Sequence, residues 1–297
     1  MIITGKKFSK PELSRVINGD TILPDDHQDE NKRRLDVVLV EKYPNYNRSS
    51  LQSFIKSGFV KVNDKVAKKP NEKVSDDAMI EMNVPERTKE LPDIPVIYED
   101  GHVVVLNKPA GLLSMAKGEY CPEPTLEDYG LLVHRLDRDT SGVVILAKDE
   151  ATQTMLRKQF QDRKAHKTYL AVVNGTPKHL EAMIDLPISR NLKRPTTFQV
   201  DQNGKPSQTH YKVLSSKHGK SLVELKPTTG RTHQLRVHLK YLDTPILGDI
   251  VYGDAKSAPR LMLHAKELEI TIPGPEGGIR KTFIAPVPTE FKEILND

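Results

Sequence analysis

Apolar and polar positions divide the chain into two stretches with different patterns. Between residue 32 and about residue 90, apolar groups at helical spacing precede brief alternating runs around turn residues. From about residue 93 onward, most apolar groups form short runs typical of strands, separated by turns that contain Gly and Pro. The proline-rich, charged segment VPERTKELPDIP separates the two patterns and is typical of a linker.

The first stretch predicts a compact helix–helix–hairpin unit. One helix would bury Leu35, Val38 and Leu39. Ser49 followed by Gln52 is typical of a capping box, which would start a second helix that ends near Gly58. The apolar face of this second helix would consist of Leu51, Phe54 and Ile55. FVKVNDKVAKK predicts two short strands around a turn at residues 63–64.

The second stretch predicts a sheet with helices packed on it. Strands are expected in VVVLNKPAGLL, at residues 143–147, in HKTYLAVVNG and in SLVELKP, with a last strand near the C-terminus. Helices are expected at residues 151–160 and in GRTHQLRVHLKYL. Most links are too short for repeated βαβ crossovers, so a mixed, largely antiparallel sheet is expected. The fold class is therefore α+β, with an extension at 1–31, a small α/β domain at 32–92 and a larger domain at 93–297.

Composition narrows the function classes. The single cysteine, Cys121, excludes an intramolecular disulfide and fits a reducing cytoplasm. No apolar run approaches the roughly 20 residues of a membrane helix, and the first residues lack a signal-peptide core. His233 and His238 lack a metalloprotease pattern, and no glycine-rich segment has P-loop spacing, so neither a metal nor a nucleotide triphosphate is expected.

Charge is unevenly distributed. The chain carries a formal net charge of +5, but the first stretch is far more basic than the rest. Its cations are Lys32, Arg33, Arg34, Lys42, Arg48, Lys56, Lys61, Lys65, Lys68, Lys69 and Lys73, against Asp36, Glu41, Asp64 and Glu72. Such an excess is typical of a phosphate-binding surface, and a merely solvated basic face is the alternative.

The segment VHRLDRDTSGVVILAKD holds the strongest candidate for chemistry. It sets Asp137 and Asp139 among arginines directly before a buried strand, as expected for a reactive loop on a rigid scaffold. A partly buried Asp137 would need a cation to stay ionised, and Arg231 in TTGRTHQLR is the candidate partner. Such a carboxylate suits nucleophilic attack or proton abstraction. A structural ion pair between two loops is the alternative.

Two other positions are ambiguous from residue type alone. Tyr169 lies in an expected strand, where it would be either core or a ring for stacking a flat substrate. Lys108, before Pro109, is compatible with a simple turn. These observations indicate a nucleic-acid-binding module joined to a domain with one carboxylate candidate, and they do not choose a reaction.

HRLDRDTSGVVILAK resembles the signature of RluA-type pseudouridine synthases. The segments LNKPAGL, KAHKTYLAVVNG, TGRTHQLRVHL, PILGDIVYG and RLMLHAKEL resemble further segments of that family, in the family order across residues 95–290. RSSLQSFIKSGFVKVNDKV resembles the RNA-binding domain named after ribosomal protein S4. One departure is LSMAKGEY, where many relatives carry a histidine–proline stretch, and it bears on substrate choice.

The resemblance implies a role for each matching residue. Asp137 would be the catalytic aspartate, Arg231 its partner, and Tyr169 the ring that packs on uracil. Arg135 would enter the RNA stack when the base leaves, and Leu235 would be the aliphatic residue near the site. Further RNA contacts are expected from Lys108, Arg48, Lys56 and Lys61.

The function implied is conversion of specific uridines to pseudouridine, in large-subunit ribosomal RNA or in a ribosome-assembly particle. Base flipping would precede an aspartate-dependent exchange of the C–N for a C–C glycosidic bond, without cofactor or metal. Alternatives are a transfer-RNA target, a non-catalytic RNA-binding or assembly protein, and glycoside hydrolysis with Asp139 as the second acid.

Overall fold

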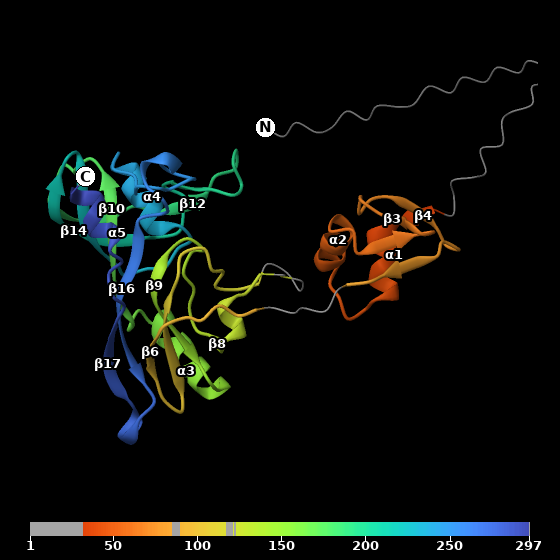
Figure 1. Ribbon diagram of the computed structural model, residues 1–297, viewed down its shortest axis with the longest axis horizontal. Helices are drawn as coiled ribbons and strands as arrows, with labels where there is room; N and C mark the ends of the chain where they lie inside the picture. Colours follow the sequence, from red (N-terminus) through yellow and green to blue (C-terminus); the bar gives the residue numbers. More distant parts are fainter. Residues whose placement is uncertain (1–31, 85–89, 117–120, 122, 297) are drawn as a thin grey trace, which may run out of the picture. The chain divides into compact units, whose positions relative to one another are not determined.

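The computed structural model describes residues 32–84, 90–116, 121 and 123–296. The chain forms two compact units that divide between Val84 and Pro85 (Figure 1). The expected N-terminal arm and part of the expected linker, residues 85–89, lie outside the described residues. None of the described helices is long and apolar enough to cross a membrane.

The smaller unit contains two helices and two small antiparallel sheets. Its elements are β1 (Lys32–Arg34), α1 (Leu35–Lys42), α2 (Arg48–Lys56), β2 (Val60–Val62), β3 (Lys65–Val66), β4 (Lys73–Ser75) and β5 (Ile80–Met82). One sheet has the order β3-β2-β5, and β1 pairs with β4. Most of the side chains expected to face inward do so: Leu35, Leu39, Leu51, Phe54 and Ile55 are buried, whereas Val38 is only partly buried. The helix–helix–hairpin prediction is therefore confirmed.

The start of α2 differs from the predicted capping box. Asn47 is the N-cap, and its Oδ1 accepts a hydrogen bond from the Ser50 amide at 3.0 Å. Gln52 instead donates to Asp36 at 2.6 Å, because a buried carboxylate competes for its amide. The hairpin turn is as expected, since Asn63 and Asp64 both have positive φ, which a tight two-residue turn requires.

Asp36 is the buried charge of the smaller unit. Its side chain is fully buried, and Arg34 and Arg48 hold it at 2.9 and 3.0 Å. The hydrogen bond from Arg34, with those of Gln52 and Arg48, holds the pKa of Asp36 well below its usual range despite burial. Arg48 therefore has a structural partner as well as a half-exposed guanidinium.

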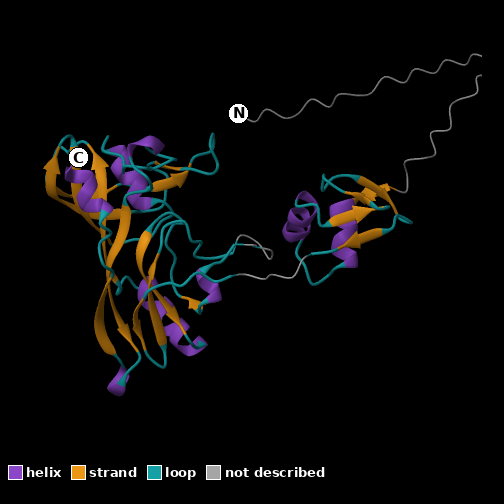
Figure 2. Cartoon of the chain, in the orientation of Figure 1, coloured by secondary structure: helices purple, strands orange, loops and turns teal. Residues whose placement is uncertain are grey.

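The larger unit is built on one ten-stranded sheet, and strands dominate it (Figure 2). The strand order is β11-β14-β15-β10-β16-β9-β7-β6, with β17 paired to β16 and β8 to β9. The strands are β6 (Val96–Glu99), β7 (Val103–Lys108), β8 (Leu131–Leu132), β9 (Ser141–Ala147), β10 (His166–Asn174), β11 (Glu181–Asp185), β14 (Gln208–Lys217), β15 (Lys220–Pro227), β16 (Leu263–Ile272) and β17 (Ile279–Ile284). A separate pair is formed by β12 (Ile188–Arg190) and β13 (Phe198–Val200).

Three helices pack on this sheet: α3 (Glu150–Gln161), α4 (Gln234–Tyr241) and α5 (Glu290–Asn296). The first two match the expected helices, whereas α5 was not predicted. Within the described residues, β9 and β16 run parallel and the other pairs of the sheet run antiparallel. The α+β fold class, with a mixed and largely antiparallel sheet, is confirmed.

The parallel joint between β9 and β16 explains the small residues at the end of the signature. Gly142 pairs with Ala265, and a Cβ at Gly142 would lie 2.1 Å from the Ala265 carbonyl oxygen. Its φ of +115° also favours glycine. Beside it, the Ser141 hydroxyl lies 2.9 Å from Nδ1 of His264. The loop that carries Asp137 is therefore anchored at its C-terminal end.

Lys108, at the end of β7, holds the same loop directly after Asp137. Lys108 is 0% exposed, and its Nζ donates to the Pro109 and Arg138 carbonyls at 2.9 and 2.8 Å. The prediction that Lys108 contacts RNA is therefore wrong, because its ammonium group is enclosed by the protein. Burial lowers the pKa of Lys108 to about 7, although the charges of Asp139 and Asp137 oppose the shift.

Lys108→Met should remove one component of the pH dependence of stability. The pKa of Lys108 is about 7 in the folded chain and about 10.4 in the unfolded chain. Between these pH values the unfolded chain therefore binds more protons at Lys108 than the folded chain does. The free energy of unfolding contributed by Lys108 should therefore rise as the pH rises through that window. Urea unfolding of the native chain and of Lys108→Met at several pH values measures the difference.

Lys178→Met is the matched control, because Lys178 is exposed. It should keep the pH dependence of the native chain. Equal slopes for native and Lys108→Met between pH 7 and 10 would show that Lys108 is not desolvated.

Candidate active site

A pocket of about 510 Å³ opens beside the signature loop. Its walls come from residues 133–140, the end of α3, the start of β10 and the segment that leads into α4. Of the residues expected from sequence to form the site, the pocket brings together Arg135, Asp137, Tyr169, Arg231 and Leu235. Lys108 and Asp139 are not among its lining residues.

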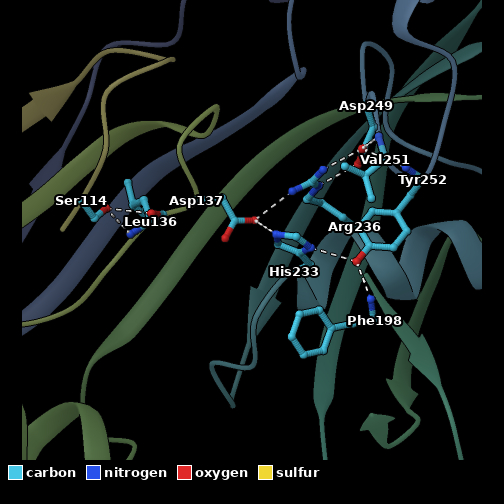
Figure 3. A network of polar contacts seen from close by, with 9 residues as sticks. All are labelled: Ser114, Leu136, Asp137, Phe198, His233, Arg236, Asp249, Val251 and Tyr252. Carbon is cyan, nitrogen blue, oxygen red and sulfur yellow. Dashed lines mark hydrogen bonds and ion pairs between the residues drawn. The ribbon is translucent and has the colours of Figure 1, made fainter. Parts of the chain in front are cut away.

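Asp137 faces a fixed cation. Its Oδ2 lies 3.3 Å from the Arg236 guanidinium, and the Asp137 side chain is 20% exposed (Figure 3). Arg236 is held from the other side by Asp249, with two hydrogen bonds of 2.7 Å. Although burial lowers the pKa of Arg236, the hydrogen bond to Asp249 and the nearby carboxylates keep it above its ordinary value. The arginine is therefore a permanent charge beside Asp137.

Asp249 is in turn held by the backbone. Its Oδ1 accepts hydrogen bonds from the amides of Val251 and Tyr252, at 2.9 and 3.0 Å. Burial raises the pKa of Asp249, but the hydrogen bond and charge of Arg236 and the two backbone amides together leave the pKa below the ordinary value. The guanidinium thus cannot rotate away from Asp137 without leaving a buried carboxylate unpaired.

The predicted pairing of Arg231 with Asp137 is wrong. Arg231 lies before α4, where its Nε donates to the Pro206 carbonyl at 3.2 Å. Arg236 instead lies in the first turn of α4, within a run of buried residues, and is aimed at the signature loop. A sequence signal was present, because an arginine inside the apolar run QLRVHL requires a buried acidic partner.

His233 was not predicted as a site residue, yet it lies beside Asp137. Its Nε2 is 3.9 Å from the Asp137 Oδ2, and its Nδ1 is 2.8 Å from the Tyr252 hydroxyl (Figure 3). The Tyr252 ring also lies under Arg236, with the guanidinium carbon 5.1 Å from the ring centroid. Burial lowers the pKa of His233, and the Asp137 charge opposes that shift.

Tyr169 lies on β10 and lines the pocket, as expected from the sequence. Burial, with a contribution from the Asp137 charge, raises the pKa of Tyr169 well above its ordinary value. The phenol is therefore neutral at physiological pH. Leu235 is buried and adds an apolar wall. Together they suit a flat, uncharged ring.

Two supports of the signature loop were not predicted. The Ser114 hydroxyl accepts from the Leu136 amide at 3.0 Å and donates to the Leu136 carbonyl at 2.7 Å (Figure 3). Ser114 belongs to LSMAKGEY, so this divergent segment helps to hold the residue before Asp137. His134 stacks on Phe160 and accepts a hydrogen bond from the Ile145 amide, and burial lowers its pKa to about 3. It is a neutral structural residue.

Arg135 is the exposed cation of the pocket wall on the signature loop. Its guanidinium lies 3.8 Å from the Met115 sulfur. Within the described ranges, no group of three or more His, Cys, Asp or Glu side chains is placed to hold a metal ion. The pocket therefore offers a partly buried carboxylate (Asp137), a fixed guanidinium (Arg236), a neutral phenol (Tyr169) and an apolar wall (Leu235).

The chain is similar to proteins named ribosomal large subunit pseudouridine synthase D. The protein from Haemophilus influenzae is 34% identical, over 89% of this chain and 90% of its own length. The protein from Borreliella burgdorferi is 36% identical, over 90% of each chain. Both alignments therefore include most of the smaller unit as well as the larger one.

Two solved structures share the fold of about two thirds of the chain. Human RNA pseudouridylate synthase domain containing 1 matches 68% of this chain and 87% of its own, with 29% identity and a TM-score of 0.58. Human RNA pseudouridylate synthase domain containing 4 matches 68% of this chain and 91% of its own, with 28% identity and a TM-score of 0.55. The S4 domain model matches residues 33–80, and the RNA pseudouridylate synthase model matches residues 102–241, the segment that contributes Asp137, Tyr169, His233 and Arg236. With these relatives and this site, the chain belongs to the RNA pseudouridylate synthase family.

Proposed function

We propose that this protein isomerises uridines of large-subunit ribosomal RNA to pseudouridine, with Asp137 as the catalytic carboxylate. The observation that carries the proposal is the placement of Asp137 at a pocket wall, against the doubly held Arg236. The names of the relatives support the choice of RNA. We propose the cytoplasm as the compartment of this protein.

The reaction breaks the bond between ribose C1′ and uracil N1, turns the base, and joins C1′ to C5. The C5 proton is then lost and N1 gains one, so atoms balance without an external reactant. A uridine inside structured RNA cannot reach the recessed carboxylate. It must be flipped out of the stack, at a cost of a few kcal/mol.

Asp137 must be ionised for either route that the chemistry allows. It attacks C1′ directly, or it removes a proton from C2′ to give a glycal and free uracil. Arg236 supports both, because its guanidinium lies 3.3 Å from the Asp137 Oδ2 and pairs with the carboxylate in a fixed position. Removal of this positive charge would leave the Asp137 carboxylate at the pocket wall without its nearest cation.

The other lining residues would hold the base and the RNA. Tyr169 and Leu235 would enclose the uracil ring, which prevents loss of the detached base to solvent. Arg135 is exposed at the pocket and would fill the space that the flipped base leaves. Arg231, also at the wall, would contact the RNA rather than Asp137.

The smaller unit would supply affinity for RNA. We place its functional boundary at residues 32–92, with the catalytic domain at 93–297. Lys56 and Lys61 are exposed, and Arg48 is half-exposed above Asp36, so their charges are available for phosphate contacts. A ribosome-assembly particle is an equally suitable substrate for such a surface.

Tritium release tests the activity. RNA labelled at C5 of uridine should lose tritium with the native chain, because C5 exchanges its hydrogen for the ribose. Asp137→Asn should reduce release to background while RNA affinity stays within about threefold, since the side chain keeps its shape but loses its charge. Unmodified ribosomal RNA and transfer RNA serve as separate substrates.

The outcomes separate the competing functions. Release from transfer RNA alone would replace the proposed target, and release by Asp137→Asn at the native rate would remove Asp137 from its role. Tight RNA binding by the native chain without release from RNA or from assembly particles would favour a non-catalytic binding protein.

Conservative substitution distinguishes the two arginines. Arg236→Lys should slow the single-turnover rate by about 100-fold, because an ammonium group cannot hold both oxygens of Asp249 and still reach Asp137. Arg231→Lys is the matched variant and should stay within about threefold. Thermal unfolding of both variants checks that they fold, and the reverse ranking of rates would restore the pairing first expected from the sequence.

Neutralising the smaller unit's lysines tests its role. The double variant Lys56→Gln, Lys61→Gln should bind RNA more weakly, and the slope of log affinity against log salt should fall by about two. Affinity is measured by filter binding from 50 to 300 mM salt, about the range in which phosphate contacts dominate. An unchanged slope would show that these lysines face solvent only.

A further inference from the structure

His233 is held in an unusual backbone conformation at the wall of the pocket. It precedes α4 with φ 56° and ψ 18°, the left-handed region that few residues other than glycine adopt. Two neighbours fix the ring through three contacts: a hydrogen bond to the Tyr252 hydroxyl, and edge contacts with the rings of Tyr252 and Phe198 at 5.5 and 5.6 Å. Such a conformation persists only where the surroundings impose it.

The hydrogen bonds of Tyr252 determine where His233 carries its proton. The Tyr252 oxygen accepts the Phe198 amide at 2.9 Å, which leaves its own hydrogen to donate. Among the described residues, the other partner of this hydroxyl is Nδ1 of His233, at 2.8 Å (Figure 3). Nδ1 is therefore the acceptor, and the neutral ring carries its proton on Nε2.

The Nε2 donor is aimed at the reacting position but has no hydrogen bond there. It lies 3.9 Å from the Asp137 Oδ2, which is too long for a hydrogen bond. The His233 side chain is 19% exposed and lines the pocket. Among the described residues this nitrogen makes no hydrogen bond, so a donor next to the catalytic carboxylate is placed to receive an oxygen atom of the substrate.

The sugar is the part of the substrate that must lie there. Whether Asp137 attacks C1′ or removes a proton from C2′, its carboxylate has to touch one of two adjacent ribose carbons. The 2′-hydroxyl is attached to C2′ and is next to C1′, so it lies within the space that Asp137 and His233 share. The uracil ring would be enclosed by Tyr169 and Leu235, as proposed above, which leaves the sugar for this donor.

We propose that His233 donates its Nε2 proton in a hydrogen bond to the 2′-hydroxyl oxygen of the flipped uridine and so selects ribose over deoxyribose. This inference rests on the proposed isomerisation and adds a specificity-determining residue to it. The 2′-hydroxyl is the group by which proteins distinguish RNA from DNA at a given nucleotide.

The test compares two labelled RNAs that differ only at the target, which is either uridine or 2′-deoxyuridine. Single-turnover tritium release gives the ratio of the two rates for each enzyme. His233→Ala should reduce that ratio by about 10- to 100-fold, chiefly through a slower rate on uridine, because the lost hydrogen bond exists only with the ribose. His233→Gln, whose amide nitrogen reaches a similar position, should recover part of the ratio.

His218→Ala is the matched control. His218 also has a left-handed backbone, with φ 51°, but it is exposed in the turn between β14 and β15. It should leave the ratio unchanged, which shows that a histidine-to-alanine change at a left-handed position away from the pocket does not by itself alter the choice of sugar. Tyr252→Phe should lower the ratio by a smaller factor than His233→Ala, because Nε2 then no longer holds the proton preferentially.

Equal slowing of both substrates by His233→Ala would overturn the inference. That result would be expected if His233 instead donated to the ribose ring oxygen, which uridine and deoxyuridine share. If tritium release from the deoxyuridine RNA falls below detection, binding replaces rate. The dissociation constants of the two RNAs are then measured for Asp137→Asn and for the double variant Asp137→Asn, His233→Ala, and their ratios are compared. Absence of release by the native enzyme from uridine would overturn the proposed function itself, whereas turnover with an unchanged ratio overturns only the role of His233.

Discussion

The site depends on one buried guanidinium shared between two carboxylates. Arg236 is tied to Asp249 by two short hydrogen bonds and reaches Asp137 with its remaining nitrogen. Two backbone amides fix Asp249, so the arginine has one orientation. A surface arginine would be mobile and screened by water, and would stabilise the charge of Asp137 much less. The pocket, the tyrosine and the histidine are arranged around this fixed charge.

The sequence predicted the main elements because their patterns are local. The strand behind the signature, the helix at α3 and the hairpin around Asn63 and Asp64 are determined by apolar spacing and turn residues. The helix α5 was missed because it follows a Pro-rich segment and buries little beyond Phe291. The cap of α2 was misassigned because a distant buried carboxylate, Asp36, takes the Gln52 side chain.

The site itself was only partly predictable. Asp137, Tyr169 and Leu235 meet at the pocket as the resemblance implies, but the arginine partner and His233 required coordinates. Which of two arginines in TGRTHQLR reaches Asp137 is decided by where α4 begins, and a shift of a few residues rotates one side chain inward and the other outward. Lys108 could not be placed correctly from the sequence either. A lysine is usually a surface cation, and only the packing of the folded chain shows that Lys108 is buried.

The joint at Gly142 has a consequence for how the protein is made. The residues that it brings together are far apart along the chain: Ser141 contacts His264, which lies 123 positions later. The strand that supports the reactive loop is therefore completed by β16, close to the C-terminus. While a ribosome is still synthesising the chain, β9 can pair with β7 and β8, but its pairing with β16 must wait until nearly the whole chain has been made. The smaller unit, built from contacts within residues 32–84, meets no such delay, so a nascent chain would acquire its capacity to hold RNA before its capacity to modify it.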